Sequence, residues 1–325
     1  MNLATRILFA VMLLVSLAGT PAFGQAWPSR PILLVNPYAA GAGVDPVARL
    51  VAQKLSDRLG QQVIVENKTG AAGMVGATYV AKAKPDGYTI MMSTAGDIAI
   101  NQHLYRDMQY NAEKDFAPIT EAVRLPFLFV AHPSVPAASV RDLVALVKAK
   151  PLGYSYASAG NGSLQHLAGA LFTDLAGVKM VHVPYKAVAP ALTDVLGGQV
   201  QTLFAGFPAA IPHVRTGKLR AMGITSAKRL AIASDIPTLA EQGLPGFEVT
   251  QWFGVFAPAQ TPPDVVARLS REIVAVLALP DVAERLSAQG AEPVASSPQE
   301  FAAFIRAEVV KFGKLVKQSG ATVDQ

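Results

Sequence analysis

The chain contains no cysteine at any of its 325 positions. This absence excludes disulfide-stapled domains, thiolate-ligated zinc and iron–sulfur sites, and enzymes with a cysteine nucleophile. Charged residues are also scarce, at 16% of the sequence against a usual share of roughly 25%. Hydrophobic residues make up 51%, which is the composition of a folded protein and not of a disordered one. The length is enough for about two domains, each with its own core.

Long apolar runs are missing too, except near the N-terminus. After a weakly basic start, residues 7–17 are apolar apart from Ser16, and Gly19 and Pro21 follow. This order of regions is typical of a secretory signal peptide, which we predict at residues 1–24. The alternative is a membrane anchor, but the run is shorter than the roughly 20 apolar residues that a span needs. We therefore expect an exported, periplasmic protein with no membrane insertion of the mature chain.

Extended basic runs are absent as well, although the formal net charge is +5. Lys82 with Lys84 and Lys228 with Arg229 are only small clusters. A nucleic-acid-binding surface needs a basic patch or stripe, so we expect no nucleic-acid partner.

What the chain does contain is a regular alternation of short apolar runs and amphipathic stretches. The runs predict strands at 32–35, 63–66, 88–92, 126–131, 154–157, 180–183, 199–204, 219–224 and 252–257. The main amphipathic stretches predict helices at 46–59, 140–148, 190–196, 263–278 and 298–319. Strands that alternate with helices predict an α/β fold, with a mainly parallel sheet and flanking helices in each of two units.

No catalytic or cofactor motif is present. The patterns G-x-S-x-G, G-x-G-x-x-G, G-x-x-x-x-G-K-[ST] and H-E-x-x-H do not occur, and the five histidines stand singly. We therefore expect no metal, no cofactor and no enzymatic activity. One alternative stays open: an exported α/β hydrolase in which Ser158 and His166 form a nucleophile–base pair.

Several glycine-containing loops follow predicted strands and open helices. A helix N-terminus offers unpaired backbone N–H groups and a partial positive charge, so it can hold an anion. In an open α/β sheet, loops at the carboxyl ends of the strands gather around one ligand crevice. Any one of these loops is equally an ordinary connection, but their number favours binding over catalysis. They lie at 38–45, 70–76, 93–97, 158–163 and 185–190.

Six segments in a fixed order carry a family resemblance. They are WPSRPILLVNPYAAGAGVDPVARLVAQKL (27–55), VIVENKTGAAGMVGATYVAKAKPDGYTIMM (63–92), YASAGNGSLQHLAGALF (156–172), VPYKAVAPALTDVLGGQV (183–200), GKLRAMGITSAKR (217–229) and PTLAEQGLPGFEVTQWFGVFAPAQTP (237–262). With these segments the chain resembles the Bug/TctC family, the periplasmic solute-binding proteins of tripartite tricarboxylate transporters. The similarity covers essentially the whole mature chain.

The resemblance implies a two-lobe periplasmic-binding-protein fold, type II-like, with the ligand cleft between the lobes. Lobe one would comprise 27–124 plus 250–325 and lobe two 125–249, with chain crossings near 123–125 and 249–252. Such a protein captures a small organic carboxylate, without catalysis, and delivers it to a membrane permease. A sensor that presents the same ligand to a receptor kinase is an alternative that the sequence does not separate from transport. We expect a monomer.

The resemblance also implies ligand contacts from both lobes. Lobe one would contribute Tyr38, Ala39, Ala40, Gly41, Asp45, Ser93 and Thr94. Lobe two would contribute Ser158, Ala159, Gly160, Asn161, His166, Tyr185, Lys186, Ala187, Ala205 and Phe207. We expect Asp45 mainly to cap the helix that starts at Pro46, and Lys186 either to pair with a carboxylate or to be solvated.

Two departures from the family pattern bear on the ligand. The first loop lacks the usual proline and paired glycines and reads Tyr-Ala-Ala-Gly-Ala-Gly at 38–43. The strand at 199–204 usually ends in an aspartate near the pocket, whereas Ala205, Gly206 and Phe207 stand here. An amino-acid ligand needs an acidic partner for its ammonium group, so this loss favours a larger or aromatic carboxylate.

Overall fold

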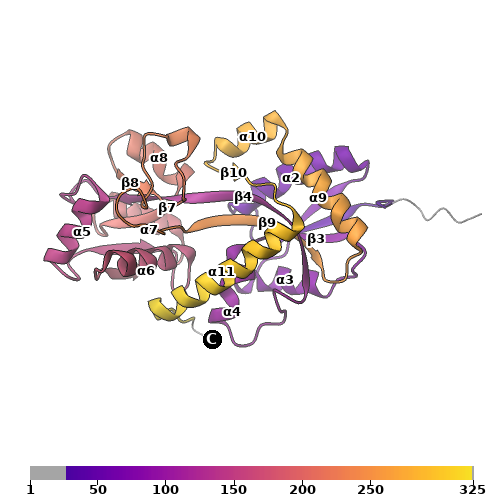
Figure 1. The fold of residues 1–325 in the computed structure, drawn as a ribbon, viewed down its shortest axis with the longest axis horizontal. Coiled ribbons are helices and arrows are strands. Elements are labelled where there is room, and N and C mark those ends of the chain that lie inside the picture. Colours follow the sequence, from indigo (N-terminus) through magenta and orange to yellow (C-terminus); the bar gives the residue numbers. More distant parts are fainter. Residues whose placement is uncertain (1–26, 324–325) are drawn as a thin grey trace, which may run out of the picture.

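The computed structural model describes residues 27–323, so the predicted signal peptide lies outside the described residues. The strands are β1 (Ile32–Asn36), β2 (Val63–Asn67), β3 (Thr89–Thr94), β4 (Phe116–Ala131), β5 (Ser155–Ser158), β6 (Val181–Pro184), β7 (Thr202–Gly206), β8 (Arg220–Ile224), β9 (Thr250–Pro258) and β10 (Glu292–Pro293). The helices are α2 (Val44–Leu59), α3 (Met74–Ala81), α4 (Asn101–Leu104), α5 (Val140–Ala149), α6 (Leu164–Ala176), α7 (Val188–Leu196), α8 (Phe207–Arg215), α9 (Pro263–Leu277), α10 (Pro280–Ser287) and α11 (Pro298–Ser319). Their alternation confirms the predicted α/β class (Figure 1).

The described strands form one sheet in the order β2-β1-β3-β9-β4-β7-β5-β6, and β8 and β10 pair with β4 outside this path. The pairs of β1 with β2 and β3, and of β5 with β6 and β7, are parallel. Every antiparallel pair involves β4 or β9. The sheet therefore has a parallel group at each end and an antiparallel junction between them, which confirms the expected parallel strands with flanking helices.

Strands β4 and β9 form this junction. Figure 1 shows them side by side along the long axis, from the end that carries α5 to α8 to the end that carries α2, α3 and α9. Within the pair, Arg124 lies opposite Trp252 and Leu125 lies opposite Gln251. The two segments predicted as chain crossings are thus paired with each other.

The strand predicted at 126–131 is only the second half of β4. Its first half contains Pro118, Glu121 and Arg124. These residues interrupt the apolar pattern, so the pattern did not predict this part of the strand. The structure accommodates these residues through register shifts on either side of Thr120 and through an ion pair between Glu121 and Arg124. Bulges of this kind are where a sheet tolerates proline and a buried charge.

Helix α11 connects the two ends of the molecule. It begins and ends as predicted, because Ser297 and Glu300 form a capping box at its start and Gly320 adopts a left-handed conformation at its end. The helix packs on β4 and reaches α6 (Figure 1). The indole N–H of Trp252 on β9 donates a 3.0 Å hydrogen bond to the Glu308 carboxylate on α11.

Helices α8 and α10 had no clear signal in the sequence. Both carry proline in the first turn, where the missing N–H costs nothing, but α8 also contains Pro212 in its interior.

No helix among residues 27–323 is long and apolar enough to span a membrane.

Candidate functional site

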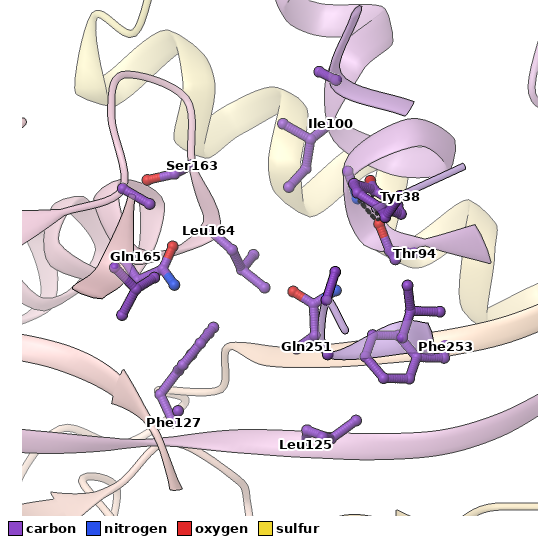
Figure 2. Close-up of a pocket in the computed structure, with 18 of the residues that line it drawn as sticks. Tyr38, Thr94, Ile100, Leu125, Phe127, Ser163, Leu164, Gln165, Gln251 and Phe253 are labelled. Carbon is purple, nitrogen blue, oxygen red and sulfur yellow. Dashed lines mark hydrogen bonds between the residues drawn. The ribbon is translucent and has the colours of Figure 1, made fainter. Parts of the chain in front are cut away.

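A cavity of about 610 Å³ opens at the junction of the two parallel groups. Figure 2 shows Leu164 and Gln165 on one side of it, Tyr38 and Thr94 on the other, and Gln251 near the middle. The described residues that line it are Tyr38, Ala42, Gly43, Val44, Ala72, Thr94, Gly96, Ile100, Asn101, Leu104, Tyr105, Leu125, Pro126, Phe127, Ala159, Asn161, Gly162, Ser163, Leu164, Gln165, Val188, Gly206, Phe207, Pro208, Ala209, Gln251, Phe253, Gln289 and Val323.

No aspartate, glutamate, lysine, arginine or histidine belongs to this lining in the part of the chain that the structure describes. The polar side chains are amides and hydroxyls, chiefly Gln165, Gln251, Gln289 and Asn161. Much of the remaining surface is aliphatic or aromatic. A charged ligand would therefore be held by dipoles and not by a counter-ion.

Helix N-termini supply those dipoles. The first residues of α2, α6, α7 and α8 all belong to the lining. At α6, Ser163 accepts a hydrogen bond from the His166 N–H, while Leu164 and Gln165 face the cavity. At α2 and α8 no side chain caps the first turn. Converging N–H groups with partial positive charge suit a carboxylate.

Five of the residues expected to contact ligand line the cavity: Tyr38, Thr94, Ala159, Asn161 and Phe207. The other expected residues lie in or beside the loops that build the wall but are not part of its surface. They are Ala39, Ala40, Gly41, Asp45, Ser93, Ser158, Gly160, His166, Tyr185, Lys186, Ala187 and Ala205.

The Asp45 carboxylate stabilises the first loop through hydrogen bonds. The helix starts two residues earlier than predicted, at Val44, so Asp45 is inside the first turn and is not its N-cap. Its carboxylate accepts hydrogen bonds from the Gly41 N–H at 3.0 Å, from the Asn36 amide at 3.1 Å and from Asn67 at 2.9 Å, and it pairs with Arg49 at 3.0 Å. Burial opposes ionisation, but these donors outweigh it and hold the pKa of Asp45 well below its usual range.

Tyr185 and Lys186 do not contribute their polar groups to the cavity surface. The Tyr185 hydroxyl donates to the Asp194 carboxylate at 2.6 Å, and Lys186 is exposed. Burial, followed by the adjacent Asp194, raises the pKa of Tyr185 to about 12. Of the two roles considered for Lys186, its exposure fits the solvated one.

Ser158 and His166 lie behind the lining and are both nearly inaccessible to solvent. The His166 ring accepts a hydrogen bond from the Gly162 N–H through Nδ1 at 3.1 Å. The Ser158 hydroxyl contacts a different histidine, His182, at 2.6 Å. These groups fix the loop at 158–163, which lines the cavity through Ala159, Asn161 and later residues.

Asp97 is a buried carboxylate that the sequence did not single out. It accepts hydrogen bonds from the hydroxyls of Tyr38 at 2.8 Å and Thr94 at 2.7 Å, and also from the Ser93 hydroxyl. Ser93 is thus tied to Asp97 instead of facing the cavity. Burial raises the pKa of Asp97, and the hydroxyl donors only partly offset it.

The central strands contribute residues that no loop motif could predict. Leu125 and Phe127 come from β4, and Gln251 and Phe253 come from β9. Leu125 and Gln251 fall within the crossings near 123–125 and 249–252 that the resemblance implies, and Phe127 and Phe253 fall within the strands predicted at 126–131 and 252–257.

The model of the family described as tripartite tricarboxylate transporter family receptor matches residues 47–321. The chain belongs to this family. The receptor is 35% identical to protein BugT of Bordetella pertussis over 98% of both chains. The resemblance drawn from the sequence is therefore confirmed.

Solved structures agree with the assignment. The receptor matches the R. palustris protein Rpa4515 with adipate at 37% identity and a TM-score of 0.78, covering 91% of this chain and 99% of that one. It matches MatC from Rhodopseudomonas palustris with bound malate at 33% identity and a TM-score of 0.73, covering 89% and 100%. The fold is that of periplasmic solute-binding proteins, and no enzymatic family is indicated.

Proposed function

We propose that this receptor captures a small organic carboxylate in the cavity and delivers it to the membrane permease of a tripartite tricarboxylate transporter. The observation that carries the proposal is the cavity wall. Among its described residues it has no charged side chain, yet four helix N-termini open onto it. Oriented N–H groups in an uncharged wall favour an anion.

The ligand class is supported by two relatives of the same family. One solved structure carries adipate and another carries malate, and both resemble the receptor over most of its length. Both ligands are small carboxylates, which is the class that the helix N-termini here suit.

The proposed mode of capture is lobe closure. Lobe one would be 27–124 plus 250–325 and lobe two 125–249, so that β4 and β9 form the hinge. Closure would bring the α6 and α8 N-termini toward Tyr38 and Thr94 and exclude water from the ligand. The receptor would act as a monomer in the periplasm after removal of the signal peptide at 1–24.

Calorimetric titration of the purified mature protein tests the binding step. The panel is acetate, hexanoate, benzoate, malate and adipate, with hexanamide as an uncharged match for hexanoate. At least one acid should bind, and hexanamide should not compete. No heat from any acid, together with binding of a sugar or a polyamine, would overturn the proposal.

One pair of variants tests whether the acid binds in this cavity. Gln165→Glu places a negative charge in the wall and should weaken binding of the preferred acid more than about tenfold. Gln109→Glu makes the same change at an exposed position and should leave the affinity unchanged.

A separate experiment tests delivery to the permease. A strain that lacks the receptor should lose uptake of the same radiolabelled acid, and the wild-type gene should restore it.

A further inference from the structure

Two close contacts beside the cavity join the proposed lobes, and each has a glycine on one side. At the first, Gly290 of lobe one lies against Phe207 of lobe two. At the second, Gly162 of lobe two lies against Leu104 of lobe one. Phe207, Gly162 and Leu104 all line the cavity, and so does Gln289. The residues that bring the lobes together are therefore also residues that surround the ligand space.

The backbone at Gly290 approaches Phe207 too closely for any side chain. A Cβ atom on Gly290 would lie 2.8 Å from Phe207 Cδ1 and 2.9 Å from both Cβ and Cγ of that residue. The Phe207 Cβ atom is bonded to the α8 backbone, so no change of rotamer removes this overlap, and the start of α8 would have to move. Gly290 also has a φ of 69°, in the left-handed region that favours glycine.

This first contact lies close to the central strand β4. Phe207 begins α8 directly after β7, and Gly290 lies two residues before β10. Strands β7 and β10 both pair with β4, at Phe127 and at Arg124 respectively. The contact is thus near the proposed hinge. In a hinge rotation, a displacement near the axis grows with distance from it, so a small obstruction here would separate the lobes.

The second contact lies on the loop that precedes α6. A Cβ atom on Gly162 would lie 2.5 Å from Leu104 Cδ1 and 3.3 Å from Cδ2, and Gly162 has a φ of 74°. The loop is held in place because the Gly162 N–H donates to His166 Nδ1 at 3.1 Å. Leu104 ends α4 and packs against the hydrophobic core, which limits its freedom to move away. Its methyl groups can still turn, so an obstruction here should matter less than one at Gly290.

We infer that Gly162 and Gly290 are positioning residues for ligand binding, because they set how closely the lobes can approach around the ligand. The inference rests on the proposed function, since it concerns the closure that captures the acid. The α2 N-terminus lines the cavity from lobe one, and the α6 and α8 N-termini line it from lobe two. A side chain at position 290 would displace the start of α8, and one at position 162 would displace the loop before α6. Hydrogen bonds from both lobes to one ligand would then lengthen and weaken.

Gly290→Ala tests the contact near the hinge by calorimetric titration with hexanoate, benzoate, malate and adipate. Each of these acids that binds the wild-type protein should bind Gly290→Ala about tenfold more weakly, because the change acts on closure and not on one end of the ligand. Unchanged affinities in folded Gly290→Ala, or a loss confined to one acid among several that bind, would overturn the inference. Failure of every acid with the wild-type protein would remove the proposed function instead.

Gly60→Ala is the matched control for backbone strain. Gly60 also follows a helix of lobe one and has a φ of 66°, but a Cβ atom there would have no neighbour within 4 Å. Its affinities should stay within about twofold of wild type. An equal loss in Gly60→Ala and Gly290→Ala would show that strain, and not the contact with Phe207, causes the effect.

Leu104→Ala provides a rescue at the second contact, because it removes the methyl groups that a Cβ atom at position 162 would meet. Gly162→Ala should weaken binding of the same acids about threefold in the wild-type background and should change it little in the Leu104→Ala background. An equal loss in both backgrounds would contradict contact between the lobes as its cause. This comparison decides the question even if Gly290→Ala does not fold.

Discussion

The Ser158 hydroxyl lies 2.6 Å from Nε2 of His182, and the ring of His182 stacks on that of His166 with centroids 3.8 Å apart. The pair that a hydrolase would need, Ser158 with His166, is not formed. Ser158 is 0% exposed and is not part of the described cavity lining, so no substrate carbonyl could reach its hydroxyl in this conformation. The cluster instead holds the loop that lines the ligand cavity.

This histidine pair predicts a loss of stability in mild acid. Burial, followed by the charge of His166, lowers the pKa of His182 from 6.5 to about 4. Between these values the unfolded chain binds a proton that the folded chain does not, so the free energy of unfolding falls as the pH drops. We expect a loss of about 2 kcal/mol from pH 7 to pH 4, after a discount for partial exposure.

Urea unfolding at pH 7, 6, 5 and 4 measures this slope. His182→Gln removes the titrating group, so its stability should fall less steeply than that of wild type across the same range. The comparison at pH 7, where His182 is neutral, separates the cost of the lost Ser158 hydrogen bond from the titration. Parallel curves for the two proteins would show that His182 does not cause the acid sensitivity.

A second prediction concerns the brace behind the first loop. Asp45→Asn removes the charge that Arg49, Asn67 and the Gly41 N–H all contact, and leaves an amide group facing donors. We expect the free energy of unfolding to drop by about 2 kcal/mol. Asp57→Asn makes the same change at an exposed position of the same helix and should cost little, so equal losses in the two variants would contradict this role.

A third prediction tests how closely α11 packs on the central strands. A Cβ atom on Gly254 of β9 would lie 2.1 Å from Phe301 Cζ, and Phe301 is fully buried. Gly254→Ala should therefore cost about 1–3 kcal/mol in thermal or urea unfolding. Gly43→Ala adds a Cβ atom whose nearest neighbour is 3.9 Å away, on a right-handed helical backbone with a φ of −51°, and should change the free energy of unfolding by less than about 1 kcal/mol. A fully stable Gly254→Ala would show that α11 can shift.

The fold could be predicted in large part because most of its elements carry a local signal. The run at 32–35 has the continuous apolar character of a buried parallel strand, and α11 is delimited by a capping box and a glycine. Helix α8 could not be predicted in this way, because its prolines at 208 and 212 read as a loop. The position of the α8 N-terminus at the cavity depends on tertiary packing.

The site was predictable only as a set of loops. The patterns singled out loops that contribute to the cavity lining. Within a loop they could not separate residues that face the cavity, such as Thr94, from residues that lie behind the lining, such as Ser93 and Asp45. Asp97 carried no signal, since a lone aspartate after a strand is an ordinary turn residue. Its role appears only when the fold brings Tyr38 to it from a distant segment.

The apolar middle of the cavity gives the final prediction. Each methylene buried there contributes about 0.8 kcal/mol, so affinity should rise about fourfold per carbon from acetate to butyrate to hexanoate. Leu125→Asn replaces part of this apolar wall and should reduce the gain per carbon, while acetate binding changes little. Leu152→Asn, at a side chain that is 59% exposed, is the matched control and should keep the wild-type slope. Calorimetry on the three acids measures both slopes, and an affinity that does not depend on chain length in the wild-type protein would show that the ligand's apolar body does not lie against Leu125.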